Sequence, residues 1–136
     1  ILTTNLTVER ITSQISSPTD LVGKRVCTVA NTTSPPALSR IGVRYTAAPQ
    51  IEDCYTGLEN GRFDAVVYDA PVLQYYVAHR GAGIADIAGP IFKHEDYGIV
   101  FPVGSPLRRE FDDALLAVQE DGEFDRLERK WFGTGG

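Results

Sequence analysis

The chain has 136 residues, of which 43% are hydrophobic and 23% charged, and this is ordinary for one soluble domain with its own core. Its net charge is −5 and its basic residues are scattered, which argues against nucleic-acid binding. No apolar run approaches the ~18 residues that a membrane helix needs. Because the chain opens on Ile1 and contains no Met, we expect it to be a segment of a longer protein.

The first half of the chain predicts strands that alternate with short helices. Residues 1–14, rich in Thr and Ser, are interpreted as a linker. The apolar run within residues 24–30 suits a buried strand. Asn31 to Ser34 are typical cap residues, and the two prolines after them predict the first turn of a helix. A short second strand is expected at residues 43–47.

The second half continues this alternation and ends in helices. One helix is predicted from an apolar face at i, i+3, i+4 and i+7, which is made by Ile51, Cys54, Tyr55 and Leu58. Apolar runs predict strands at residues 65–68 and 97–101, with a helix at 71–79 between them. Two amphipathic helices close the chain, marked by Leu107, Phe111, Leu115 and Val118 and by Phe124, Leu127 and Trp131.

This order of elements predicts the fold class. Strands that alternate with helices favour right-handed crossover connections and a mostly parallel sheet. The predicted class is therefore α/β, with a linker or hinge at residues 1–14, a lobe at 15–102 and C-terminal helices at 103–136.

The first candidate site is formed by Asn31, Thr32 and Thr33, which follow a predicted strand and precede a predicted helix. Backbone N–H groups and the positive end of the helix dipole favour an anion there, and the hydroxyls add further donors. A ligand carboxylate would suit such a site. The alternative is that these residues only cap the helix, as Thr and Ser commonly do.

The second candidate is Asp69, which follows the strand at 65–68. Ligands of open α/β sheets gather outside the carboxyl ends of the strands, and a carboxylate there can hold an ammonium group. The alternative is that Asp69 caps the helix that begins at Ala70 and Pro71. Together, an anion site and a carboxylate at neighbouring strand ends suit a zwitterion.

Motifs for catalysis or metal binding are poor. His79 and His94 lack metal-ligand spacing, and no nucleophile elbow or phosphate-binding loop occurs. We therefore expect a binding module without cofactor or metal. Cys27 and Cys54 fit either a reducing compartment or one disulfide in an oxidising one. A helix packed on a sheet usually keeps its Cα atoms beyond ~7 Å, so we expect both cysteines to be buried and unbonded.

Several segments, in one order, make the chain resemble class 3 periplasmic solute-binding proteins. These segments are Asp20–Val26 (DLVGKRV), Asn60–Asp69 (NGRFDAVVYD), Tyr97–Pro102 (YGIVFP), Gly104–Leu107 (GSPL) and Gly122–Gly133, which ends in KWFG. Residues 3–11 (TTNLTVERI) resemble a shortened form of the sequence that follows the last pore-lining helix in ionotropic glutamate receptors, particularly prokaryotic potassium-selective ones. The resemblance implies the second of two segments that together build a ligand-binding core.

The resemblance also implies roles for single residues. Asn31, Thr32 and Thr33 stand where relatives hold the ligand's carboxylates, although many relatives have Gly-Ser-Thr there. Asp69 stands where a family carboxylate grips the α-ammonium. The family's arginine for the α-carboxylate, and an aromatic residue that packs on the ligand, belong to the other lobe. No arginine of this chain matches that motif, so the chain would carry half of a site.

The resulting hypothesis is a bilobed receptor for a glutamate-like amino acid, in which lobe closure opens a potassium-conducting cation pore. Its parent would be a cell-membrane protein, and this chain would be part of its extracytoplasmic domain. The expected partners are the missing lobe 1, on which residues 103–136 would pack, and further copies in a homo-oligomer. The rival is a soluble periplasmic amino-acid-binding protein of an ABC importer. An enzyme is a further alternative, with Asp69 as its acid or base.

Overall fold

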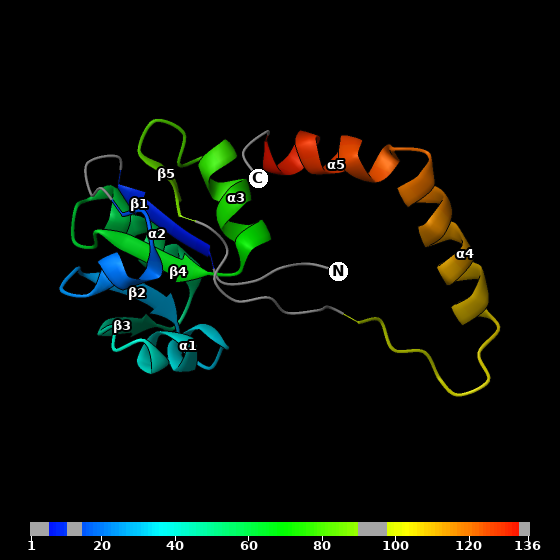
Figure 1. Cartoon of the computed structure of the whole chain (residues 1–136), viewed down its shortest axis with the longest axis horizontal. Helices are drawn as coiled ribbons and strands as arrows, with labels where there is room; N and C mark the ends of the chain where they lie inside the picture. Colours follow the sequence, from blue (N-terminus) through cyan, green and yellow to red (C-terminus); the bar gives the residue numbers. More distant parts are fainter. Residues whose placement is uncertain (1–5, 11–14, 90–97, 134–136) are drawn as a thin grey trace.

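The centre of the molecule is a five-stranded sheet in the order β3-β2-β4-β1-β5 (Figure 1). The computed structural model describes residues 6–10, 15–89 and 98–133. The strands are β1 (Leu6–Arg10), β2 (Val26–Val29), β3 (Tyr45–Ala48), β4 (Ala65–Tyr68) and β5 (Ala85–Ala88). β2 is parallel to β3 and β4, whereas β1 is antiparallel to β4 and β5, so only β1 runs against the others. The predicted mostly parallel α/β fold is confirmed.

Helices cover both faces of this sheet. They are η1 (Pro18–Leu21, a 3-10 turn), α1 (Ser34–Arg40), α2 (Ile51–Glu59) and α3 (Ala70–Ala78). The core beneath α2 and α3 includes Cys27, Cys54, Leu58, Val66 and Leu73. The core on the opposite face includes Leu21, Val26, Leu38, Val43 and Val67. Successive residues of β4 point to opposite faces, which explains why its apolar run is buried on both sides.

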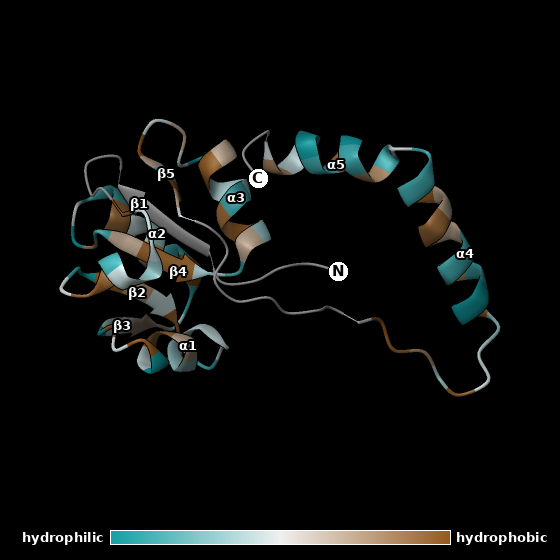
Figure 2. Cartoon of the chain, in the orientation of Figure 1, coloured by the Kyte–Doolittle hydropathy of each residue, from teal (hydrophilic) through white to brown (hydrophobic). Residues whose placement is uncertain are grey.

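The two predicted C-terminal helices are present and form an arm that extends from the sheet (Figure 1). α4 spans Leu107–Glu120 and α5 spans Glu123–Phe132, and neither helix buries any residue. Both carry hydrophilic and hydrophobic stretches (Figure 2). The end of α5 returns to α3, where the rings of Tyr75 and Trp131 have centroids 6.5 Å apart. None of the helices in the described part of the chain has the length and apolarity needed to cross a membrane.

Two sequence-based expectations differ from the structure. The strand expected at 97–101 is wrong over residues 98–101, where Ile99 and Val100 are exposed, and Tyr97 lies outside the described residues. The edge strand is instead β5, whose buried Ala85 and Ala88 pair with β1. The range expected as a linker contains β1. This strand has the sequence LTVER and lies between β4 and β5 in the sheet.

The cysteine prediction was half right. Cys27 and Cys54 are both fully buried, as expected, but they form a disulfide. Their Cα atoms lie 5.5 Å apart, within the range of about 4.4–6.8 Å that a disulfide needs.

Candidate functional site

The carboxyl ends of β2 and β4 are neighbours and define the edge at which the candidate residues lie. In the β2–β4 register, Val26 pairs with Ala65 and Cys27 with Val66. If this register is extended along both strands, Ala30 lies level with Asp69. The segment that begins at Asn31 therefore starts beside Asp69, although 38 positions separate the two residues in sequence. α1 and α3 both begin at this edge.

The turn after β2 depends on a specific backbone conformation at Asn31. Its φ is +58°, and it is the only non-glycine residue with positive φ in the described part of the chain. Asparagine tolerates this left-handed region better than most residues do. The Thr32 hydroxyl donates a hydrogen bond to the Val29 carbonyl at 2.8 Å, which closes the turn. Thr33 then occupies the N-cap position of α1.

Asp69 occupies the equivalent position before α3. It is half-buried and is the N-cap residue of that helix. Its carbonyl accepts hydrogen bonds from the backbone N–H groups of Val72 and Leu73, both at 3.1 Å. The pKa of the neighbouring Tyr68 is raised, first by burial and then by the charges of Asp69 and Glu52. A half-buried carboxylate thus lies beside a partly buried tyrosine at this edge.

The structure therefore brings all four predicted residues to one edge, with Asn31, Thr32 and Thr33 at one strand end and Asp69 at the next. Thr33 and Asp69 occupy equivalent positions at this edge, since each is the N-cap residue of the helix that follows. In the part of the chain that the structure describes, no group of three or more His, Cys, Asp or Glu side chains could hold a metal ion.

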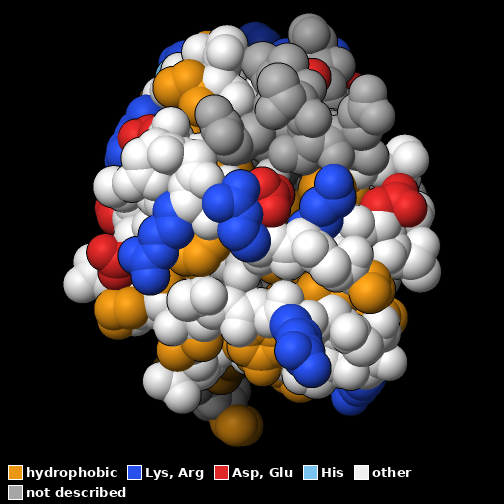
Figure 3. Space-filling view, turned by 90° about the vertical axis from the view of Figure 1, so that its left-hand side faces the viewer, with side chains coloured by type: hydrophobic (Ala, Val, Ile, Leu, Met, Phe, Trp, Pro, Cys, Tyr) orange, Lys and Arg blue, Asp and Glu red, His pale blue; other side chains and the backbone are white. Residues whose placement is uncertain are grey.

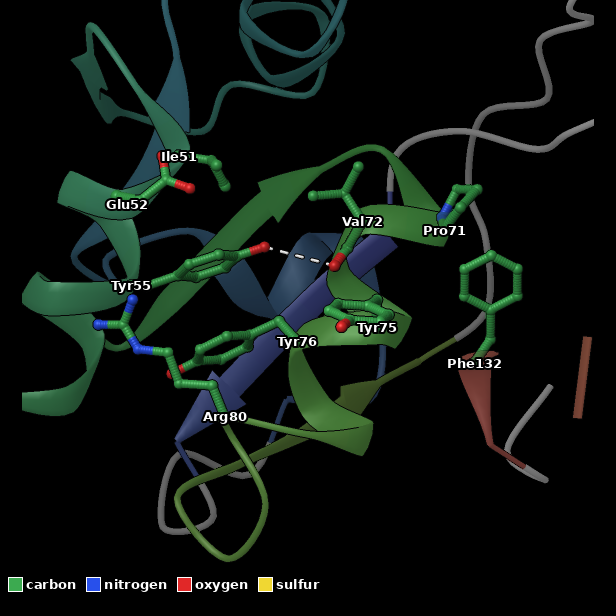
Figure 4. Close-up of a pocket in the computed structure, with 9 residues that line it drawn as sticks. All are labelled: Ile51, Glu52, Tyr55, Pro71, Val72, Tyr75, Tyr76, Arg80 and Phe132. Carbon is green, nitrogen blue, oxygen red and sulfur yellow. Dashed lines mark hydrogen bonds between the residues drawn. The ribbon is translucent and has the colours of Figure 1, made fainter. Parts of the chain in front are cut away.

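A groove between α2 and α3 was not anticipated from the sequence. It encloses about 460 Å³ and is lined by Ile51, Glu52, Tyr55, Pro71, Val72, Tyr75, Tyr76, Arg80 and Phe132 (Figure 4). Tyr55 and Tyr76 stack within it, with ring centroids 3.8 Å apart and planes 5° from parallel. Tyr55 and Tyr76 were the available signal, since buried tyrosines keep a polar tip that must find a partner.

Three polar side chains of this groove, those of Tyr55, Tyr76 and Arg80, are paired with neighbouring groups. The Tyr76 hydroxyl donates to Glu59 at 3.1 Å, and Arg80 Nε lies 2.8 Å from the same carboxylate. The Arg80 hydrogen bond holds the pKa of Glu59 below its usual value. Burial raises the pKa of Tyr76 to about 12. The Tyr55 hydroxyl donates to the Val72 carbonyl at 3.4 Å, the bond drawn in Figure 4. The groove is therefore a largely apolar, aromatic surface in which Arg80 is neutralised by Glu59.

Comparison with known proteins identifies relatives of one functional kind. No protein-family model matches the chain. "Glutamate receptor ionotropic, NMDA 2D" of mouse and of human are each 40% identical to it over 91 residues, which is 65% of this chain and 7% of the receptor. Human "Glutamate receptor ionotropic, NMDA 2C" is 39% identical over 83 residues, which is 60% of this chain and 7% of the receptor. The chain thus matches only a small part of the curated receptors.

Two solved structures match nearly the whole length of this chain. The GluR0 ligand-binding core from Nostoc punctiforme, in complex with L-glutamate, is 38% identical with a TM-score of 0.74, and the match covers 96% of this chain and 61% of that core. An ancestral arginine-binding protein bound to glutamine is 31% identical with a TM-score of 0.71, over 98% of this chain and 61% of that protein. These relatives are receptors and binding proteins, which confirms the prediction of a binding module rather than an enzyme.

Proposed function

We propose that this chain, which is an amino-acid-binding segment of the ionotropic glutamate receptor type, supplies one lobe of a two-lobed receptor that gates a potassium-selective pore. Its ligand is a glutamate-like amino acid. The match to 61% of the Nostoc core supports this reading, since the rest of that core has no counterpart in the chain. The observation that carries the proposal is the edge shared by Asn31–Thr33 and Asp69, in a fold whose relative holds L-glutamate.

In this proposal the two strand ends bind opposite charges of the ligand. Asp69 accepts hydrogen bonds from the α-ammonium group, and a charge-assisted bond of this kind is about twice as strong as a neutral one. A ligand carboxylate receives hydrogen bonds from the backbone N–H groups and hydroxyl at the start of α1. The hydrogen bond from the Thr32 hydroxyl to the Val29 carbonyl holds this turn in place.

The missing lobe 1 completes this site and couples it to the pore. A ligand that contacts both lobes only when they approach shifts the population toward the closed form. The C-terminal helices α4 and α5 pack on lobe 1 in the complete receptor, which explains why they bury no residue here. Further copies assemble around one pore as a homo-oligomer. An extracytoplasmic location agrees with these relatives and with the Cys27–Cys54 disulfide, which persists in oxidising compartments.

A second candidate is a soluble amino-acid-binding protein of an ABC importer. It is favoured by the match to an ancestral arginine-binding protein at 31% identity. The sequence of the full gene separates the two candidates. A pore sequence upstream of this segment would exclude the soluble binding protein. A first lobe that continues directly into this segment, without a pore, would support the soluble binding protein.

Asp69→Asn in the complete two-lobed core tests the role of the carboxylate. Removing one partner of a buried charge pair costs about 2–5 kcal/mol, so we expect glutamate affinity to fall by about thirtyfold or more in calorimetric titration. Asp53→Asn, on the exposed face of α2, is the matched control and should bind like the parent. Circular dichroism confirms that both variants are folded. Binding by Asp69→Asn within about threefold of the parent would show that the ammonium role is wrong.

A further inference from the structure

Three neighbouring strands each begin just after a cationic residue. β2 follows Arg25, β3 follows Arg44, and β4 begins three residues after Arg62. Because these strands are parallel, their starts meet at the amino edge of the sheet, at the end of the molecule opposite Asp69. With Lys24, these side chains line a hollow of about 340 Å³, which we call the amino-edge hollow.

Figure 3 looks onto this end of the molecule. Lys and Arg side chains gather across the middle of the face, with apolar side chains and some acidic ones between them. The apolar part of the hollow includes Tyr45 and Phe63. Four of the 13 cationic residues of a chain with a net charge of −5 are therefore concentrated at one end of the sheet.

One of the four cations has a structural role. Arg25 forms an ion pair with Asp64, and its Nη1 donates to the carbonyl of Gly61 at 2.9 Å, at the end of α2. The hydrogen bond from the Arg25 side chain to the Asp64 carboxylate holds the pKa of Asp64 below its usual value, and the nearby charge of Lys24 adds to the effect. Arg25 thus joins β2 to the start of β4, and Asp64 neutralises its charge.

The other two arginines of the hollow, Arg44 and Arg62, lie on the surface. Arg62 is exposed, and its guanidinium carbon lies 5.1 Å from the centroid of the buried Phe63 ring. A cation–π contact of this kind holds the side chain over the hollow. Arg44 is exposed at the start of the edge strand β3. Arg44 and Arg62 carry like charges at the same hollow, and a multivalent anion between them would relieve their repulsion.

We propose that the amino-edge hollow binds a phosphate group, carried either by a free polyphosphate or by the headgroup of an anionic lipid. The planar fork of a guanidinium matches phosphate oxygens and can form two parallel hydrogen bonds with them. Arg44 and Arg62 line the hollow from two different segments, so each can bind a different oxygen. The apolar ring of Phe63 supports Arg62 and reduces the water around its guanidinium.

Titration with inorganic pyrophosphate at low salt tests the site on this chain. We expect saturable binding by the parent and a loss of about tenfold or more in affinity in Arg44→Gln/Arg62→Gln. Arg108→Gln/Arg109→Gln on α4 is the control, because it removes the same charge from exposed positions outside the hollow and should change affinity by no more than about twofold. Arg62→Lys keeps the charge but not the fork and should bind with intermediate affinity.

Vesicle co-sedimentation separates the two sources of phosphate. The chain is mixed with vesicles of phosphatidylcholine alone, or of equal parts phosphatidylcholine and phosphatidylglycerol. Retention by the anionic vesicles that is lost in Arg44→Gln/Arg62→Gln identifies a lipid headgroup, whereas pyrophosphate binding without retention identifies a free polyphosphate. Absence of both, or equal losses in the variant and the control, would overturn the proposal. Neither measurement depends on amino-acid binding, so a failure of the Asp69 proposal leaves this one intact.

Discussion

Cys27 of β2 and Cys54 of α2 are joined by a disulfide across a sequence separation of 27 residues, and both are fully buried. The bond ties the helix to the strand that leads into Asn31. It also removes conformational freedom from the unfolded chain, and a loop of this size corresponds to a stabilisation of about 3–4 kcal/mol in the chain-entropy model.

Reduction of this bond should therefore lower the free energy of unfolding by about 2–4 kcal/mol. The measurement is urea unfolding followed by circular dichroism, with and without a reductant. A Cys27→Ala/Cys54→Ala variant supplies the control, because reductant should leave its unfolding midpoint unchanged. If the parent unfolds at the same urea concentration in both conditions, the disulfide is either absent or without energetic consequence.

Gly57 has a steric role in the packing of α2. A Cβ added there would lie 2.3 Å from Cδ2 of Phe63, a ring that is buried. Helix propensity alone favours alanine by about 1 kcal/mol, whereas overpacking a core costs about 1–3 kcal/mol. We expect Gly57→Ala to give a net loss of stability in chemical denaturation.

Two further variants isolate this clash. Gly98→Ala places its Cβ in open space and should leave stability nearly unchanged. Replacing the ring in Gly57→Ala/Phe63→Leu should recover part of what Gly57→Ala loses, if the two are coupled. A gain of stability in Gly57→Ala alone would mean that the Phe63 ring moves aside freely.

The Arg25–Asp64 ion pair predicts a specific acid sensitivity. The pKa of Asp64 in the folded chain lies below its ordinary value of 3.8, chiefly because of the hydrogen bond from Arg25. The stabilisation is therefore present above about pH 4 and is lost as pH falls through the folded-state pKa. Unfolding measured from neutral to acidic pH should show a shallower acid loss in Asp64→Asn than in the parent. Asp113→Asn, on the exposed surface of α4, should follow the parent, and identical profiles for all three proteins would contradict the prediction.

The apolar stripe of α4 predicts self-association of the isolated chain. Leu107, Phe111 and Leu115 recur every four residues and are 59%, 38% and 42% exposed. Patches of this kind are seldom left uncovered on monomers. Sedimentation velocity should show concentration-dependent dimers, which Phe111→Gln/Leu115→Gln weakens and Asp113→Asn on the opposite face of the helix preserves. A parent chain that stays monomeric at high concentration would rule this out.

Local sequence patterns determined much of this protein. The spacing of Ile51, Cys54, Tyr55 and Leu58 predicted α2, and the run Ala65–Tyr68 predicted β4 with its observed bounds. These patterns succeed because burial imposes a period of 3.6 residues on a helix and of two on a strand. That the segments after β2 and β4 lie together was also predictable, since parallel neighbours end at one edge.

Only the tertiary structure decided which distant segments pair. The place of β1 between β4 and β5, and the choice of β5 over residues 98–101, depend on which strand edge is available once the sheet has formed. The disulfide depends on how closely α2 approaches β2, a distance that no spacing of cysteines encodes. The amino-edge hollow is of the same kind, because Arg25, Arg44 and Arg62 look scattered along the chain and meet only where three parallel strands begin.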